Sequence, residues 1–167
     1  CLAQMVNVLQ ALLLVQGDRI VKTPTYHAFD LYRPHRGGEA VRFITAAEEL
    51  SRGDEAPEVR DYSLERGAFS LRVVHGSASV RDGTLCITAV NTHPTQPIEL
   101  DVQLIRGTLD EVEVVELAGD SLTAHNTAER PDAVRLLPER RVRARGSSLR
   151  VPLRAASVVR LRGRLSL

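Results

Sequence analysis

Paired carboxylates are the residues of this sequence best suited to catalysis, because two nearby carboxyl groups can act as a nucleophile and a general acid/base. The candidate clusters are Glu48-Glu49, Asp54-Glu55, Asp110-Glu111 and Glu113. Each falls in a charged connecting stretch or on the polar side of an alternating segment. Carboxylates in such places are ordinarily solvated surface groups. We therefore assign no catalytic residue in this chain.

The five histidines are spread too widely to form a metal or catalytic site. His27 and His35 flank one predicted helix, and three others fall in separate segments: His75, His93 and His125. The sequence contains no H-E-x-x-H pattern, no Ser-His-Asp elbow and no glycine-rich phosphate loop. We expect no metal ion and no organic cofactor.

Charge and composition exclude several classes of partner. The 167 residues carry a net charge of +1, and the basic groups are scattered arginines, since Lys22 is the only lysine. This balance gives no electrostatic case for nucleic acid or for an anionic membrane surface. No apolar run approaches the ~18 residues of a membrane span. Two cysteines do not suit a disulfide-stapled secreted domain, so we expect a cytoplasmic protein in which Cys86 is a free, buried thiol.

Period-two alternation of apolar residues dominates the chain after Gly38 and predicts β-strands. TLCITAVN turns Leu85, Ile87 and Ala89 to one side, and PIELDVQLI alternates in the same way from Ile98 to Leu104. Further candidates are AVRFIT (40–45), FSLRVVH (69–75), SASVR (77–81), EVEVVEL (111–117), RVRAR (141–145), LRVPL (149–153) and VVRLR (158–162). Asp82-Gly83 between two such segments favours a two-residue hairpin turn. The pattern predicts a mainly β fold, an antiparallel β-sandwich of the jelly-roll type.

The first 38 residues differ in pattern from the rest. Apolar residues between Leu2 and Leu13 recur every three or four positions, which favours a helix, although a short buried strand fits the same run. Thr23 and Pro24 have the residue types of an N-cap and a first helical position. We expect a helix from about Pro24 to Tyr32, with Leu31 and the aromatic residues Tyr26 and Phe29 buried and His27 packed between them.

The segment of residues 119–138 contains an unusual polar motif between two predicted strands. Residues 120–134 read DSLTAHNTAERPDAV, and we expect them to form a long loop. The side chains of His125, Asn126 and Thr127 are well suited to organise such a loop by hydrogen bonds to the backbone.

Three motifs in this chain resemble α-L-arabinofuranosidases of glycoside hydrolase family 51. Cys1-Leu2-Ala3-Gln4 with Asn7-Val8 resembles a run near the last strand of the catalytic barrel in that family. Thr23-Pro24-Thr25-Tyr26-His27 with Phe29 and Tyr32 resembles a run on the last barrel helix. The third motif lies in the predicted loop, between Leu122 and Pro131. It is similar to the family's L-T…N-A-H-N-T-F-E-x-P stretch, with Ala128 in place of the family's phenylalanine. The chain opens on Cys1 within a motif, so we expect it to be part of a longer protein.

The resemblance implies a division of the chain and a reaction for the longer protein. Residues 1–38 would be the C-terminal remnant of a catalytic (β/α)8 barrel, with a strand at Cys1–Gln4, and residues 39–167 would be a C-terminal β-sandwich. The longer protein would be a retaining hydrolase that releases terminal non-reducing α-L-arabinofuranosyl residues from oligosaccharides and polysaccharides, using two carboxyl groups. Both family glutamates lie upstream, so this chain alone would be inactive. The resemblance also suggests a homo-oligomer.

Gln4 is the one residue to which the resemblance gives a contact with substrate. Active sites of parallel barrels form at the C-terminal ends of the strands, where Gln4 would lie. A neutral amide offers donors and an acceptor that suit sugar hydroxyls. The glutamine that matches Gln4 in the family contacts bound arabinose.

A non-catalytic carbohydrate-binding or structural β-sandwich module is the alternative interpretation. Sugar-binding sandwiches usually present exposed aromatic platforms, and this chain has three Tyr, three Phe and no Trp. The helix would use three of them, leaving Phe43, Tyr62 and Phe69. Without barrel neighbours, residues 1–36 should be the least stable part of the isolated chain and removable without unfolding the sandwich.

Overall fold

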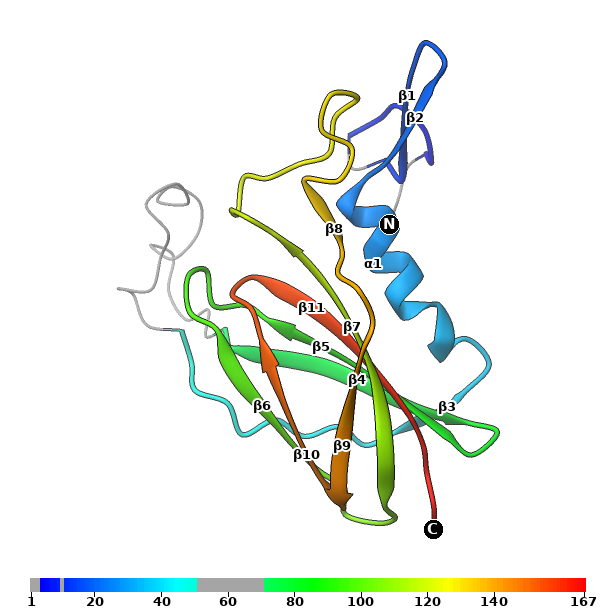
Figure 1. Ribbon diagram of the computed structural model, residues 1–167, viewed down its shortest axis with the longest axis vertical. Helices are drawn as coiled ribbons and strands as arrows, with labels where there is room; N and C mark the ends of the chain where they lie inside the picture. The colour runs from blue at the N-terminus through cyan, green and yellow to red at the C-terminus, as the bar shows by residue number, and fades with distance from the viewer. Residues whose placement is uncertain (1–3, 10, 51–70) are drawn as a thin grey trace.

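The described residues form two hydrogen-bonded β-sheets and one α-helix, whose arrangement Figure 1 shows. The structure is a computed structural model that describes residues 4–9, 11–50 and 71–167. The chain begins with a two-stranded hairpin, β1 (Leu13–Gln16) and β2 (Arg19–Lys22), which turns at Gly17 with φ +62°. The helix α1 (Pro24–Tyr32) follows, and a single 3-10 turn, η1 (Arg33–His35), ends it. No helix among the described residues is long and apolar enough to cross a membrane.

The hairpin corrects the helical interpretation of residues 2–13. The described part of this run contains no helix, and its C-terminal end enters β1. The spacing of three and four misled because several of these apolar side chains are exposed in this structure, including Met5 and Leu9. Periodicity predicts a helix only when one side of the pattern is buried.

The helix α1 begins as the sequence predicts, but buries fewer residues than expected. The Thr23 side chain accepts a hydrogen bond from the Tyr26 N–H at 3.3 Å, and Pro24 occupies the first turn. Leu31 is fully buried against Val115 and Leu117 of the large sheet. Tyr26 and His27 are half-buried, whereas Phe29 is 57% exposed, so the prediction that Phe29 is buried was wrong.

The large antiparallel sheet contains the remaining strands, which are ordered β3-β4-β5-β11-β7-β9-β10-β6, with β8 paired to β7. Their bounds are β3 (Glu39–Val41), β4 (Val74–Arg81), β5 (Thr84–Asn91), β6 (Ile98–Gln103), β7 (Leu109–Gly119), β8 (Val134–Leu136), β9 (Arg140–Gly146), β10 (Ser148–Leu153) and β11 (Ser157–Arg164). Every pairing between these strands is antiparallel.

The sheet curls so that its two ends face each other across one apolar core (Figure 1). The pairing of β7 with β9 contains a register shift between Leu109 and Glu111. Irregularities of this kind bend a strand and so contribute to the curl of the sheet. The core gathers the alternating residues that the sequence predicts: Leu85, Ile87, Ala89, Leu100, Val112, Val114, Val151, Val159 and Leu161, with Ile98, Val102 and Leu104 at its margin. The predicted antiparallel β-sandwich is therefore confirmed, with its two layers joined in one continuous sheet.

Three strand predictions need adjustment. The strand β3 ends at Val41, so only the first two residues of AVRFIT (40–45) lie in a strand. Of FSLRVVH, only Val74 and His75 belong to a strand, β4, which continues through SASVR to Arg81, while Phe69 lies outside the described residues. The long loop after β7 contains the short strand β8. The Asp82-Gly83 turn is confirmed: Asp82 (φ +49°) and Gly83 (φ +69°) join paired Arg81 and Thr84, as a type I′ hairpin requires.

Candidate functional site

Gln4 lies in an exposed segment that runs beside the β1–β2 hairpin. Residues 1–3 are outside the described chain, and Gln4 itself belongs to no strand, so the strand expected at Cys1–Gln4 is not seen at its described residue. The Asn7 side chain bonds both backbone groups of Val15, accepting from its N–H at 2.6 Å and donating to its C=O at 3.0 Å. The backbone of the segment that follows Gln4 is also bonded to β1, because the Leu13 N–H donates to the Met5 C=O at 3.0 Å.

The polar motif of the β7–β8 connection does organise its loop, as the sequence predicts. Asn126 is buried, and its Oδ1 accepts from the Val134 N–H at 2.7 Å while its Nδ2 donates to the Val134 C=O at 2.8 Å. Thr127 Oγ1 accepts from the Arg130 N–H at 3.1 Å, and the His125 ring lies 3.0 Å from the Thr123 C=O. Sequence reasoning did not foresee that Asn126 also donates to the Lys22 C=O at 2.8 Å.

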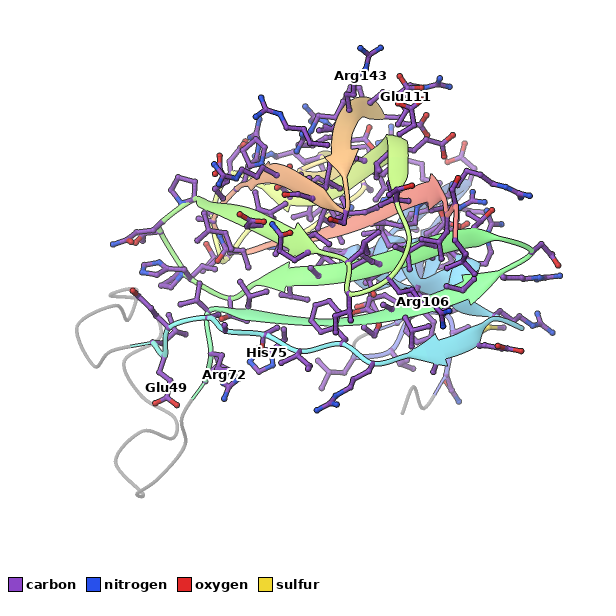
Figure 2. The ribbon with its side chains drawn as sticks, turned by 90° about the horizontal axis from the view of Figure 1, so that it is seen from below. Glu49, Arg72, His75, Arg106, Glu111 and Arg143 are labelled. Carbon is purple, nitrogen blue, oxygen red and sulfur yellow. The ribbon has the colours of Figure 1, made fainter. Side chains whose placement is uncertain are left out.

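The carboxylates singled out in the sequence do not come together. Figure 2 shows Glu49 and Glu111 on opposite sides of the molecule. Glu111 is half-exposed and pairs with Arg141 of β9 at 2.9 Å. Asp54 and Glu55 lie outside the described residues. The described carboxylates of these clusters lie at the surface: Glu48, Glu49, Asp110 and Glu111 are exposed and Glu113 is partly exposed.

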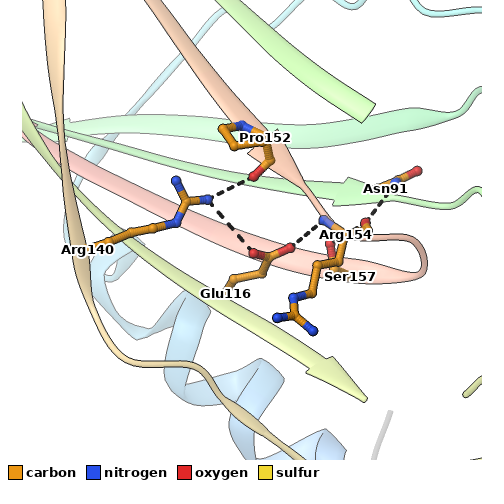
Figure 3. Close-up of polar contacts among 6 residues, drawn as sticks. All are labelled: Asn91, Glu116, Arg140, Pro152, Arg154 and Ser157. Atoms are coloured by element: carbon orange, nitrogen blue, oxygen red, sulfur yellow. Dashed lines mark hydrogen bonds and ion pairs between the residues drawn. The ribbon is translucent and has the colours of Figure 1, made fainter. Parts of the chain in front are cut away.

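Glu116 is the one buried carboxylate in the described part of the chain, and the sequence analysis did not single it out. Its Oε1 accepts from the Arg154 N–H at 2.7 Å, and its Oε2 lies 3.9 Å from the Arg140 guanidinium (Figure 3). Asn91 and Ser157 both donate to the Arg154 C=O at 2.8 Å. Glu116 therefore fixes the connection between β10 and β11. The alternating pattern around Glu116 did not indicate this role, because the contact joins Glu116 to Arg154, which is far away in the sequence.

His35 forms a polar cluster where η1 covers the outer face of the large sheet. Its Nδ1 lies 2.7 Å from Ser79 Oγ and its Nε2 lies 3.1 Å from Thr88 Oγ1, with the Cys86 sulfur 3.7 Å from Nε2. Burial lowers the pKa of His35 below its ordinary value and raises the pKa of the Cys86 thiol. Cys86 is buried and free, as predicted, but its protonated state gives it no nucleophilic character.

The remaining histidines serve local structure. His93 is buried, and its Nδ1 accepts from the Thr95 and Gln96 N–H groups at 3.2 and 3.0 Å. His75 is exposed on β4. Burial, followed by the nearby charge of Lys22, lowers the pKa of His27. No group of three or more His, Cys, Asp or Glu in residues 4–9, 11–50 and 71–167 is placed to hold a metal ion.

A cavity of about 760 Å³ lies between the segment after β3 and strand β6. Phe43, Leu100 and Val102 are among its lining residues, and Phe43 is the aromatic side chain that the described residues contribute to it. Its surface is mainly apolar, although charged residues such as Arg42, Glu99 and Arg106 also line it. In the part of the sandwich that the structure describes, no exposed aromatic side chain offers a stacking platform, and Tyr62 and Phe69 lie outside it.

The structure is an antiparallel β-sandwich in which buried polar side chains such as Asn126 and Glu116 hold a loop and a strand connection in place. The profile of the α-L-arabinofuranosidase C-terminal domain matches residues 1–157, and the chain belongs to that family.

Characterised relatives agree with this assignment. An intracellular exo-α-L-arabinofuranosidase from Bacteroides ovatus is 28% identical over 96% of the chain, which spans 29% of that relative's length. The crystal structure of a family 51 arabinofuranosidase from Xanthomonas axonopodis pv. citri superposes with a TM-score of 0.80 at 31% identity, over 96% of this chain and 30% of that one. An α-L-arabinofuranosidase from Thermotoga maritima, solved with arabinose, shares the fold at a TM-score of 0.73 and 21% identity, over 96% and 32% of the two chains.

Proposed function

We propose that this chain works as the C-terminal part of a retaining α-L-arabinofuranosidase. The observation that carries the proposal is the family match over residues 1–157. In this proposal, residues 39–167 are the supporting sandwich and residues 1–38 complete an upstream (β/α)8 barrel. Two glutamates of that barrel would act as nucleophile and acid/base on terminal non-reducing α-L-arabinofuranosyl residues of oligosaccharides or polysaccharides. The protein would be cytoplasmic and form a homo-oligomer.

The exposed apolar side chains of the N-terminal part support the proposed barrel contact. Met5, Leu9, Ile20 and Phe29 are 65%, 93%, 68% and 57% exposed, whereas Leu31 of α1, which packs on the large sheet, is buried. Exposed apolar patches of this kind are typical of surfaces that meet another protein part. A barrel packed on this side would cover them.

Gln4 would contact the arabinofuranosyl unit in the assembled enzyme. Gln4 is exposed in this structure, so its side-chain amide is available to a ligand. The backbone that follows it is held in place, because Met5 and Asn7 both hydrogen-bond to Leu13. The side-chain carbonyl would accept a sugar hydroxyl and the NH2 group would donate to another.

The test compares this chain with a protein that also carries the upstream barrel, using 4-nitrophenyl α-L-arabinofuranoside. We expect turnover from the longer protein only. In the longer protein, Gln4→Ala should lower kcat/KM roughly 10-fold or more, the loss associated with a hydrogen bond made by a buried substrate. Gln16→Ala, an exposed glutamine on β1, is the matched control and should leave kinetics unchanged. Turnover by the present chain would contradict the division of labour, and normal kinetics in Gln4→Ala would remove Gln4 from the site.

A further inference from the structure

The β7–β8 connection is longer than two paired antiparallel strands need. It covers residues 120–133, although β7 and β8 pair directly from Leu117 to Gly119 and could be joined by a tight turn. Connections of this length in compact domains usually have a function of their own. Figure 1 shows that this connection rises away from the curled sheet to lie beside the β1–β2 hairpin.

Asn126 makes the contact between this loop and the hairpin. Its side chain is 2% exposed, and both Nδ2 hydrogens are used, one on the Val134 C=O and one on the Lys22 C=O, each at 2.8 Å. Its Oδ1 accepts from the Val134 N–H. An amide with all these groups engaged has a single orientation, so Asn126 fixes β2 relative to the start of β8. A second and exposed contact, from Arg19 to the Ala128 C=O at 3.3 Å, joins the same two segments.

Hydrogen bonds continue from Lys22 to the backbone next to Gln4. Lys22 is the ladder partner of Leu13 in the β1–β2 hairpin. Leu13 in turn donates to the Met5 C=O at 3.0 Å and accepts from the Asn7 N–H at 3.1 Å. Met5 follows Gln4 directly in the chain. The β7–β8 connection is thus linked to the segment that carries Gln4 by hydrogen bonds that pass through the two strands of the β1–β2 hairpin.

We propose that Asn126 is a positioning residue that sets where Gln4 stands in the sugar site, an inference that rests on the proposed function. The sandwich then has a part in substrate binding that its own surface does not show. Catalytic and binding groups lose effectiveness when they move by about 1 Å. A hairpin released from the loop would allow displacements of that size at the segment bearing Gln4.

A double-mutant cycle in the complete enzyme tests this inference on 4-nitrophenyl α-L-arabinofuranoside. Asn126→Ala should lower kcat/KM roughly 10-fold. Combined with Gln4→Ala, it should add little further loss, because both changes remove the same interaction. Thr127→Ala is the matched control, since the Thr127 side chain bonds to Arg130 and Glu129 of the same loop, and it should leave kcat/KM unchanged. Where Gln4→Ala itself lowers kcat/KM, fully additive losses, or an Asn126→Ala enzyme with normal kinetics, would overturn the proposal.

Hydrogen exchange separates this inference from the proposed contact of Gln4. In Asn126→Ala, the amides of Asn7 and Leu13 should exchange on the order of 10-fold faster, while core amides of β11 keep their protection. If Gln4→Ala has normal kinetics but this change in exchange is seen, the contact with sugar fails and the positioning of the segment stands. Unchanged exchange refutes the positioning. If Asn126→Ala does not fold, Asn126→Asp keeps the Oδ1 acceptor for Val134, lacks both donors, and is subject to the same criteria.

Discussion

Replacing Glu116 by alanine should destabilise the protein far more than replacing Glu111, although both carboxylates lie on β7 and face arginines of β9. The Glu116 side chain is 6% exposed and accepts from the Arg154 N–H at 2.7 Å, whereas Glu111 is 52% exposed. Loss of Glu116 leaves a backbone N–H without its acceptor and Arg140 without its anion. A buried group deprived of its partner costs about 1–3 kcal/mol.

The matched variant Glu111→Ala removes an ion pair of 2.9 Å at the surface. Such pairs contribute ~0–1 kcal/mol, because water and salt screen them. For a chain of this size, a loss of about 2 kcal/mol lowers Tm by roughly 4–8 °C, and a loss below 1 kcal/mol lowers it by no more than about 4 °C. Glu116→Gln keeps an acceptor for Arg154 and should fall between the two.

Thermal and urea unfolding of the three variants, followed by circular dichroism at neutral pH, provides the measurement. Raising the salt concentration should shrink the Glu111→Ala effect and leave the Glu116→Ala effect nearly unchanged. Equal losses of stability in the two alanine variants would refute the reasoning, because burial would then have no bearing on the value of the contact.

Three further changes test other parts of the structure. Burial lowers the pKa of His35 and of His27, so the unfolded state binds more protons than the folded state below about pH 6.5. Urea unfolding should therefore find full stability above that pH and a decline in stability as pH falls toward about 5. The decline should be less steep in His35→Gln. Leu31→Ala should cost about 2–5 kcal/mol by chemical denaturation, whereas Phe29→Ala on the exposed side of the same helix should cost less than about 0.5 kcal/mol. Gly83→Ala should lose about 1–2 kcal/mol in the same assay, since φ at this position is +69°.

Local signals in the sequence predicted the elements whose cause is local. Thr23 and Pro24 fixed the start of α1, because capping involves only neighbouring residues. Asp82-Gly83 fixed one hairpin in the same way. Alternation identified the core side of β5 and β6 because both strands have one side turned to the same apolar interior.

Contacts between distant segments account for what the sequence did not reveal. Both faces of β5 are buried, since Cys86 and Thr88 lie under η1, but alternation predicts only the Leu85 face. Phe29 was expected inside because it is large and apolar, and its exposure depends on which side of α1 meets the sheet. The Asn126–Lys22 bond joins segments from opposite ends of the fold, and no spacing in the chain encodes it.

The proposed boundary at residue 38 separates the N-terminal hairpin and helix from the β-sandwich, but close contacts cross it. Leu31 fills the apolar site formed by Val115 and Leu117, and His35 bonds Ser79 and Thr88 on the sheet. The expectation that residues 1–36 could be removed freely therefore holds at most for the exposed part before α1. A chain lacking α1 and η1 would expose the outer apolar face of β7 and leave Ser79 on β4 and Thr88 on β5 without their histidine partner. The sandwich and the helix that precedes it form one packing unit, and through Asn126 that unit extends to the segment that carries Gln4.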